Sequence, residues 1–316
     1  MKDRFGREID YLRISITDRC NLRCRYCMPE DGFHKVDSRQ VLTIDEYIEI
    51  VKAFKELGIK KVRITGGEPL VKYGVIDLIK GIKELGIEDI SMTTNGILLK
   101  DMAKELKDAG LNRVNISLDS LKEDRYSHIT RGGKLKDVLE GIEACKKYGI
   151  SPIKINTVVL RSFNLDEYKD FLELTKDEDI IVRFIELMPI GEAIKNKDDF
   201  ISNEELINLC GNLKPVRESI GSGPAKYYKI DGYKGEIGFI NPISCNFCKN
   251  CNRIRLTVKG NLVLCLHSKK TVNIKTPLRN GEDIKQVILQ AIDEKPERHS
   301  LIQGKYNETD MNEIGG

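Results

Sequence analysis

Three cysteines near the amino-terminal end constrain this chain more than any other feature of its sequence. Cys20, Cys24 and Cys27 form the pattern C-x3-C-x2-C. Thiolates at such close spacing suit zinc or an iron–sulfur cluster, and four thiolates normally complete either site. No fourth cysteine lies nearby, so the motif favours a [4Fe–4S] cluster with one iron open to another ligand. A zinc site with a distant fourth ligand, or cysteines that merely pack in a core, are the alternatives.

The composition places the chain among folded proteins of the cytoplasm. Of its 316 residues, 40% are hydrophobic and 32% are charged, which fits one large α/β domain with a smaller appended part. The sequence has no apolar signal stretch and no apolar run of membrane-spanning length, so we expect no membrane partner. In a reducing compartment, nine cysteines indicate metal or redox chemistry rather than disulfides. A net charge of +3 is too small to indicate a nucleic-acid partner.

Strands and amphipathic helices alternate over the first 190 residues. The predicted helices end at Gly58, Gly86, Gly110 and Gly149, each suited to a left-handed C-cap. The predicted strands are Tyr11–Ile16, Val62–Ile64, Ile90–Thr93, Val114–Leu118, Ile153–Leu160 and Ile180–Glu186. Alternating units of this kind predict a parallel sheet with helices outside it. Six units favour an open (β/α)6 barrel of the triosephosphate-isomerase type, and a doubly wound open sheet is the alternative.

The repeating pattern stops near residue 190, which divides the chain into two predicted regions. We assign residues 1–190 to the partial barrel and residues 191–316 to a C-terminal extension. The polar residues of the barrel follow its strands, where the active sites of such barrels lie. The extension contains the predicted helix Asn203–Leu209 and the predicted strands Lys226–Ile230 and Glu236–Ile240.

A second group of cysteines lies in the extension. Cys248, Cys251 and Cys265 form the pattern C-x2-C-x13-C, and Cys245 stands three residues before the first of them. Zinc is an alternative here too, since paired CxxC motifs are common in zinc ribbons. All four thiols would make a closed site, either structural or for electron transfer. If only three bind, a second cluster with an open iron would face the barrel.

Two arginines follow this second group directly. Arg253 and Arg255 are two residues apart, which puts both on one face of a strand. Guanidinium groups match phosphate oxygens with paired hydrogen bonds. We therefore expect them to bind a triphosphate.

The whole pattern resembles a known enzyme family. The first cysteine motif, with Tyr26 before its last cysteine, resembles the signature loop of radical S-adenosylmethionine (SAM) enzymes. The stretch Leu12-Arg-Ile-Ser-Ile-Thr-Asp-Arg-Cys20, the stretch Cys251-Asn-Arg-Ile-Arg-Leu256 and the terminal Gly-Gly together resemble the GTP 3′,8-cyclase family, essentially end to end. In that family a 5′-deoxyadenosyl radical made from SAM takes the 3′ hydrogen of GTP. The C3′ radical then attacks C8, giving (8S)-3′,8-cyclo-7,8-dihydroguanosine 5′-triphosphate for molybdopterin biosynthesis.

The resemblance implies a role for individual residues of this chain. Two [4Fe–4S] clusters would be held by Cys20, Cys24 and Cys27 and by Cys248, Cys251 and Cys265. The SAM-contacting positions are Tyr26, Gly67, Ser117 and Met188. The GTP-contacting positions are Arg13, Arg63, Thr93 (with Thr94 as its neighbouring alternative), Lys154, Arg253 and Arg255. Catalytic roles fall on Arg253 and Arg255 and on Gly315 and Gly316, because the family's glycine tail enters the active site. Cys245 departs from the family pattern.

The resemblance also implies partners. We expect GTP as substrate, an electron donor of the flavodoxin or ferredoxin type, and the next enzyme of the molybdopterin pathway. A homodimer is compatible with the sequence, which does not fix the oligomeric state. Two rival functions remain open at this stage. One is another radical SAM enzyme that acts on a peptide or metabolite, and the other is a non-enzymatic metal protein such as a zinc module or redox sensor.

Overall fold

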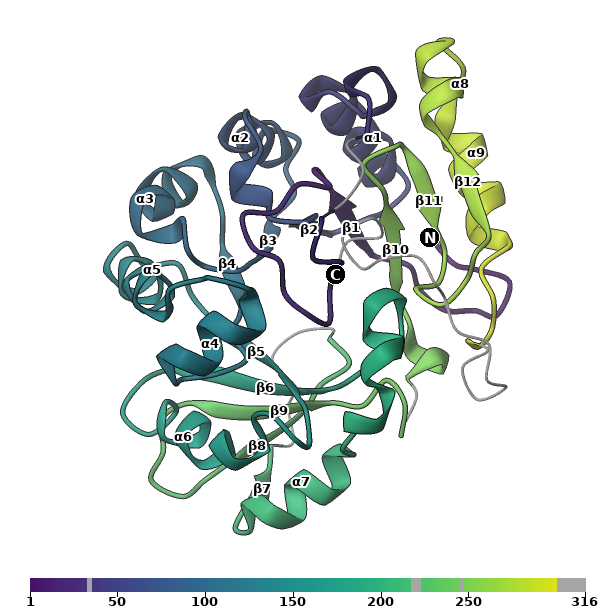
Figure 1. Cartoon of the computed structure of the whole chain (residues 1–316). Helices are drawn as coiled ribbons and strands as arrows, with labels where there is room; N and C mark the ends of the chain where they lie inside the picture. Colours follow the sequence, from purple (N-terminus) through teal and green to yellow (C-terminus); the bar gives the residue numbers. More distant parts are fainter. Residues whose placement is uncertain (33–35, 217–222, 245–246, 300–316) are drawn as a thin grey trace.

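The computed structural model of the chain describes residues 1–32, 36–216, 223–244 and 247–299, and its helices surround a curved parallel sheet (Figure 1). The first six strands pair in parallel and in chain order. They are β1 (Tyr11–Ser15), β2 (Lys61–Thr65), β3 (Asp89–Thr94), β4 (Arg113–Ser117), β5 (Ile153–Val159) and β6 (Ile180–Glu186). The predicted (β/α)6 barrel is confirmed.

The helices of the barrel begin and end where the sequence signals lie. They are α1 (Ile44–Glu56), α2 (Val75–Glu84), α3 (Leu99–Ala109), α4 (Glu123–Thr130), α5 (Leu135–Lys147) and α6 (Tyr168–Glu173). Short 3₁₀ helices span Ser38–Gln40, Pro69–Val71, Leu165–Glu167, Gly191–Asp199 and Cys248–Asn250. Thr43 and Glu46 form a reciprocal capping box at the start of α1. Across the described residues, every helix is too short or too polar to cross a membrane.

The C-terminal region extends the same sheet at both edges. Its strands are β7 (Lys214–Pro215), β8 (Lys226–Lys229), β9 (Glu236–Ile240), β10 (Arg253–Leu256), β11 (Asn261–Val263) and β12 (Thr271–Asn273). Its helices are α7 (Asn203–Cys210), α8 (Lys275–Arg279) and α9 (Ile284–Asp293). Strand β9 pairs in parallel with β6, and β10 pairs in parallel with β1. The six-stranded barrel is therefore flanked by two further parallel strands that the sequence pattern did not reveal as such.

Strand alternation sorts the side chains of β1 into two sets. Leu12 and Ile14 are fully buried in the main hydrophobic core, which the surrounding helices cover. Since successive residues point to opposite faces of a strand, Tyr11, Arg13 and Ser15 face the inside of the barrel. The barrel interior therefore carries polar side chains, and the apolar core lies between sheet and helices.

Two helix glycines give a test of this packing. A Cβ on Gly141 of α5 would lie 2.4 Å from the carbonyl oxygen of Gly96, whereas a Cβ on Gly81 of α2 would lie 2.4 Å from the Cδ1 end of Ile48. A backbone carbonyl cannot move aside as a side-chain end can. We expect Gly141→Ala to destabilise the fold by about 1–3 kcal/mol. The matched Gly81→Ala should be neutral or stabilise it by up to about 1 kcal/mol.

Thermal melting of the two purified variants under the same anaerobic conditions measures this difference. A Gly141→Ala protein that melts at or above the wild-type temperature would contradict the close approach of α5 to the segment before α3.

Candidate functional site

The first three cysteines lie in the loop between β1 and α1. This loop is braced by its own backbone, since the N–H of Cys27 donates to the carbonyl of Cys24 at 2.9 Å. The N–H of Leu22 points to the sulfur of Cys20 at 3.4 Å. Arg131, at the end of α4, donates from Nη1 to the carbonyls of Arg23 (2.8 Å) and Met28 (3.0 Å). The loop is thus fixed to the barrel around its thiols.

Gly67 holds the loop from the side of β2. Its N–H donates to the carbonyl of Thr17 at 2.7 Å, and the N–H of Glu68 donates to the carbonyl of Arg19 at 2.8 Å. A Cβ at Gly67 would lie 2.3 Å from the Arg19 carbonyl oxygen, so only glycine allows this approach. The predicted SAM-contacting glycine therefore lies directly against the cysteine loop.

Glu68 connects this turn to the end of β3. Its buried carboxylate accepts hydrogen bonds from the Thr94 hydroxyl at 2.8 Å and from the N–H of Asn95 at 2.7 Å. The Asn95 side chain in turn donates to that of Asn21, inside the cysteine loop, at 2.7 Å. Thr94 is therefore used to hold the turn. By contrast, the neighbouring Thr93 hydroxyl is buried without a hydrogen-bond partner among the described residues.

The thiols of the first group fit a cluster better than a single ion. All three are free of disulfides. Burial, and then the nearness of Cys27, raises the pKa of Cys24 well above its usual range, so a thiolate here needs a positive metal centre. In the described part of the chain, no three His, Cys, Asp or Glu side chains are arranged around one ion. A four-iron cluster takes each thiolate at a different iron, and the all-thiol donor set is the one it prefers.

Tyr26, inside this loop, is bound to the segment that follows β4. The Tyr26 hydroxyl donates to Asp119 at 2.6 Å, and the other oxygen of Asp119 accepts from the N–H of Val158 at 2.9 Å. Burial raises the pKa of Asp119 to about 6. Ser117 ends β4, two residues before Asp119. The ends of β4 and β5 thus fix the ring of Tyr26 next to the thiols, a role of Asp119 that the sequence did not reveal.

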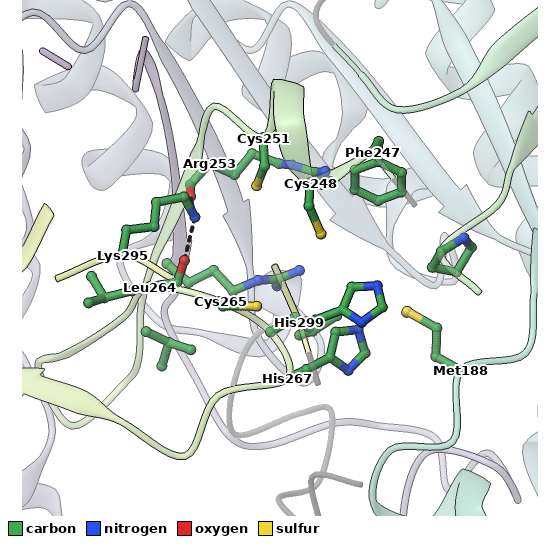
Figure 2. A pocket seen from close by; sticks show the side chains of 14 residues that line it. Met188, Phe247, Cys248, Cys251, Arg253, Leu264, Cys265, His267, Lys295 and His299 are labelled. Carbon is green, nitrogen blue, oxygen red and sulfur yellow. Dashed lines mark hydrogen bonds between the residues drawn. The ribbon is translucent and has the colours of Figure 1, made fainter. Parts of the chain in front are cut away.

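The second group of cysteines lines a pocket (Figure 2). Cys248, Cys251 and Cys265 share this open space of about 590 Å³ with Arg253 and Arg255. Met188, which follows β6, lies across the pocket from the cysteines. The three thiols are free of disulfides, and the same all-thiol argument favours a cluster here. The structure therefore brings the predicted second metal group together with two of the predicted phosphate ligands.

Nearby cations favour the thiolate form of Cys251 in this second group. Burial raises the pKa of Cys251, but Arg253 and Lys295 more than offset this effect, and the pKa falls to about 7. Burial raises the pKa of Cys265, and the backbone N–H of His267 and the Lys295 charge oppose this rise only in part. The pocket is thus more positive around Cys251 than the first loop is around Cys24.

Three arginines form a row between the two cysteine groups. Arg255 on β10 is opposite Arg13 on β1, and Arg13 is opposite Arg63 on β2. Neighbouring strands are about 4.8 Å apart, so these like charges face the barrel interior side by side. Burial, and then Arg255, lowers the pKa of Arg13 well below its usual range. Burial, and then Arg253, lowers the pKa of Arg255 to about 10.

The row continues around the barrel as further cations. Lys154 on β5 is 5% exposed and donates to the Tyr227 hydroxyl at 3.3 Å. Burial, and then Arg183, lowers the pKa of Lys154 to about 7. Arg183 on β6 donates to the side chains of Asn156 (2.8 Å) and Asn115 (2.6 Å). The interior thus gathers several cationic side chains from neighbouring strands.

The sequence did not indicate two residues of the site, Arg183 and Lys295, and three predicted residues lie outside the described part of the chain. Arg183 lies within an apolar strand and Lys295 follows an ordinary helix, so neither carried a motif. Arg183 alone could have been found, because β6 residues alternate between faces. Cys245, Gly315 and Gly316 lie outside the described residues. The other predicted positions are found at the two cysteine groups or along the interior strands between them.

Family comparisons agree with this arrangement. Residues 14–175 match the radical SAM superfamily, and residues 180–301 match the family described as Molybdenum Cofactor Synthesis C. A protein of Alkaliphilus oremlandii named GTP 3′,8-cyclase is 54% identical over 321 residues, covering 100% of both chains. A protein of the same name from Peptoclostridium acidaminophilum is 50% identical over 317 residues, covering 99% of this chain and 98% of that protein.

Solved structures share the fold at low sequence identity. SuiB of Streptococcus suis bound to the precursor peptide SuiA has a TM-score of 0.62 at 14% identity, covering 97% of this chain and 76% of that one. The structure titled native anSMEcpe with bound AdoMet has a TM-score of 0.54 at 17% identity, covering 93% of this chain and 83% of that one. With relatives at half identity over full length and two matching family models, the chain belongs to the radical SAM superfamily and, within it, to the GTP 3′,8-cyclase family.

Proposed function

We propose that this chain converts GTP to 3′,8-cyclo-7,8-dihydro-GTP in a SAM-dependent radical reaction that opens molybdopterin biosynthesis. The observation that carries the proposal is the row Arg255, Arg13 and Arg63. It concentrates like charges inside a barrel, between two groups of thiols. Like charges side by side repel one another, and a triphosphate would supply several negative charges that offset this repulsion.

The first thiols, Cys20, Cys24 and Cys27, would hold the cluster that binds SAM. When bound and reduced, this cluster and SAM supply a 5′-deoxyadenosyl radical. The protein's part is to orient the groups around it. Gly67 keeps the turn after β2 against the cysteine loop, and Asp119 fixes the phenol of Tyr26 through a 2.6 Å hydrogen bond. Ser117 and Met188 would complete the SAM site from the ends of β4 and β6.

The second thiols, Cys248, Cys251 and Cys265, would hold the cluster that orients the guanine. Arg253 and Arg255 line the same pocket as these thiols. A nucleotide bound there would therefore have its phosphates close to the row of arginines. Thr93 is the better candidate than Thr94 for a contact with GTP. Its buried hydroxyl lacks a partner in the described part of the chain, whereas the Thr94 hydroxyl is used by Glu68.

Finer assignments complete the proposal. Gly315 and Gly316 would enter the active site, as in the family. The electron donor would be a protein of the flavodoxin or ferredoxin type, and the product would pass to the next enzyme of the pathway in the cytoplasm. Residues 1–190 and 191–316 would divide the work between SAM and substrate. The sheet nevertheless continues across this division through β9 and β10.

The formation of 5′-deoxyadenosine tests the proposed reaction. Protein with reconstituted iron–sulfur clusters is incubated anaerobically with SAM and a strong reductant. Three parallel reactions contain GTP, ATP or no nucleotide. We expect 5′-deoxyadenosine to rise only with GTP, together with a product that has the mass of a GTP isomer. Cys24→Ala should abolish SAM cleavage. Cleavage that is indifferent to GTP would discard the substrate but keep the radical chemistry.

Removal of two arginines tests the phosphate site. The double variant Arg253→Ala with Arg255→Ala should keep both iron and sulfide content but bind GTP at least about tenfold more weakly, because it loses charge-assisted hydrogen bonds. Equilibrium dialysis with GTP and no reductant measures the affinity. Arg279→Ala is the matched control, since Arg279 is exposed and paired with Glu46. An unchanged GTP affinity in the double variant would remove the assigned role.

The pKa of Lys154, about 7, predicts a pH dependence of GTP binding. Below this pKa the ammonium form attracts the triphosphate. As the pH rises above it, the free protein loses the proton that binding must restore. The wild-type affinity should therefore fall several-fold from about pH 7 to about pH 8.5, by at most about tenfold per pH unit. Lys154→Arg keeps its charge throughout this range, so its binding should vary less. Equal pH profiles for both proteins would refute the role of Lys154.

A further inference from the structure

Lys295 is the most deeply buried lysine of the described structure, and it lies at the second cysteine group. Its side chain is 1% exposed. It donates from Nζ to the carbonyl of Arg253 at 2.9 Å and also to the carbonyl of Leu264. Arg253 stands two residues after Cys251, and Leu264 directly precedes Cys265. One ammonium group thus joins the two segments that carry these thiols (Figure 2).

Among the described residues, no carboxylate balances the charge of Lys295. Within residues 1–32, 36–216, 223–244 and 247–299, no Asp or Glu forms an ion pair with it. Arg7 provides the contrast. It also contacts this region, donating to the carbonyl of Cys248 at 3.0 Å, but its guanidinium is paired with Asp3 at 2.6 Å. The two carbonyl oxygens accept from two of the three N–H donors of the ammonium group, and they do not neutralise its charge.

A buried positive charge is unfavourable by itself, because it has lost its hydration. It becomes favourable when negative charge lies nearby. Among the described residues, the thiols of Cys251 and Cys265 are the groups able to carry negative charge that act on Lys295, and both line the same pocket. As thiolates on a cluster they would supply that charge. Reduction of the cluster by one electron would increase it.

We propose that Lys295 is a positioning residue for the second cluster. Its buried charge stabilises the thiolates of Cys251 and Cys265 and raises the reduction potential of the cluster that they hold. The inference rests on the second cluster of the proposed function, but not on GTP. Net charge close to an iron–sulfur cluster is one of the factors that set its potential. The electron itself comes from an external reductant, and no covalent bond changes in this step.

A redox titration followed by electron paramagnetic resonance tests the proposal. Every protein carries Cys24→Ala, so that the signal comes from the second cluster alone, and GTP and SAM are omitted. Lys295→Met removes the charge at similar volume. We expect the one-electron reduction equilibrium to fall at least about tenfold, a potential lower by about 59 mV. Lys295→Arg keeps the charge and should stay near the parent value.

Two further variants keep the experiment decisive. Lys295→Gln is neutral but still donates a hydrogen bond, so it should lower the potential as the methionine variant does. Lys270→Met is the matched control, because Lys270 is 61% exposed and paired with Glu294, the neighbour of Lys295. It should leave the potential unchanged.

The outcomes separate the two proposals. If the parent protein assembles no second cluster, the proposed function fails together with this inference. If the cluster assembles and the neutral variants keep the parent potential, only the inference is overturned. Should the neutral variants lose iron, Lys295→Arg must restore both the iron content and the potential. A failure of that rescue also overturns the role of the charge.

Discussion

The parallel pairing of β10 with β1 is the interaction on which the site depends. It joins Tyr11 to Arg253 and Arg13 to Arg255, and the side chain of Asn252 adds a 2.6 Å hydrogen bond to Asp10. Since Cys251 stands just before β10, the same pairing fixes the second group of thiols to the strand that leads into the first group. A displacement of β10 would move the second group of thiols away from the first and would also separate Arg255 from Arg13.

The cationic side chains inside the barrel lower the stability of the fold. Burial lowers the pKa of Arg13 and Lys154 because the charged forms lose hydration, and repulsion from neighbouring cations lowers it further. An apolar interior would make a more stable barrel. The strands hold these charges in place beforehand, so little of the free energy of binding the proposed triphosphate would be needed to gather them. At the second pocket Lys295 is a buried cation of the same kind, and the proposed partners of its charge are thiolates instead of phosphates.

Local signals in the sequence predicted local structure well. The capping box at Thr43 and the left-handed glycines at Gly58 and Gly110 lie where they were expected. The spacing of the second cysteine group also predicted that its thiols lie together, since Cys248, Cys251 and Cys265 line one pocket. The parallel pairing of β9 and β10 was not predictable, because hydrophobic alternation does not say which distant strand is the partner. For the same reason Lys295 gave no signal, since its importance comes from neighbours far away in the chain, whereas the alternation of β6 could have placed Arg183 on the interior face.

The pairing of β1 with β10 also affects how the chain folds during its synthesis. Asp10 and Asn252 touch although 242 residues separate them. During synthesis β1 therefore leaves the ribosome long before its second neighbour exists, and one of its edges stays open while β2 to β6 assemble beside it. An open edge invites pairing with a strand of another chain. The nascent protein is thus most at risk of aggregation until residue 256 has emerged and β10 can close that edge.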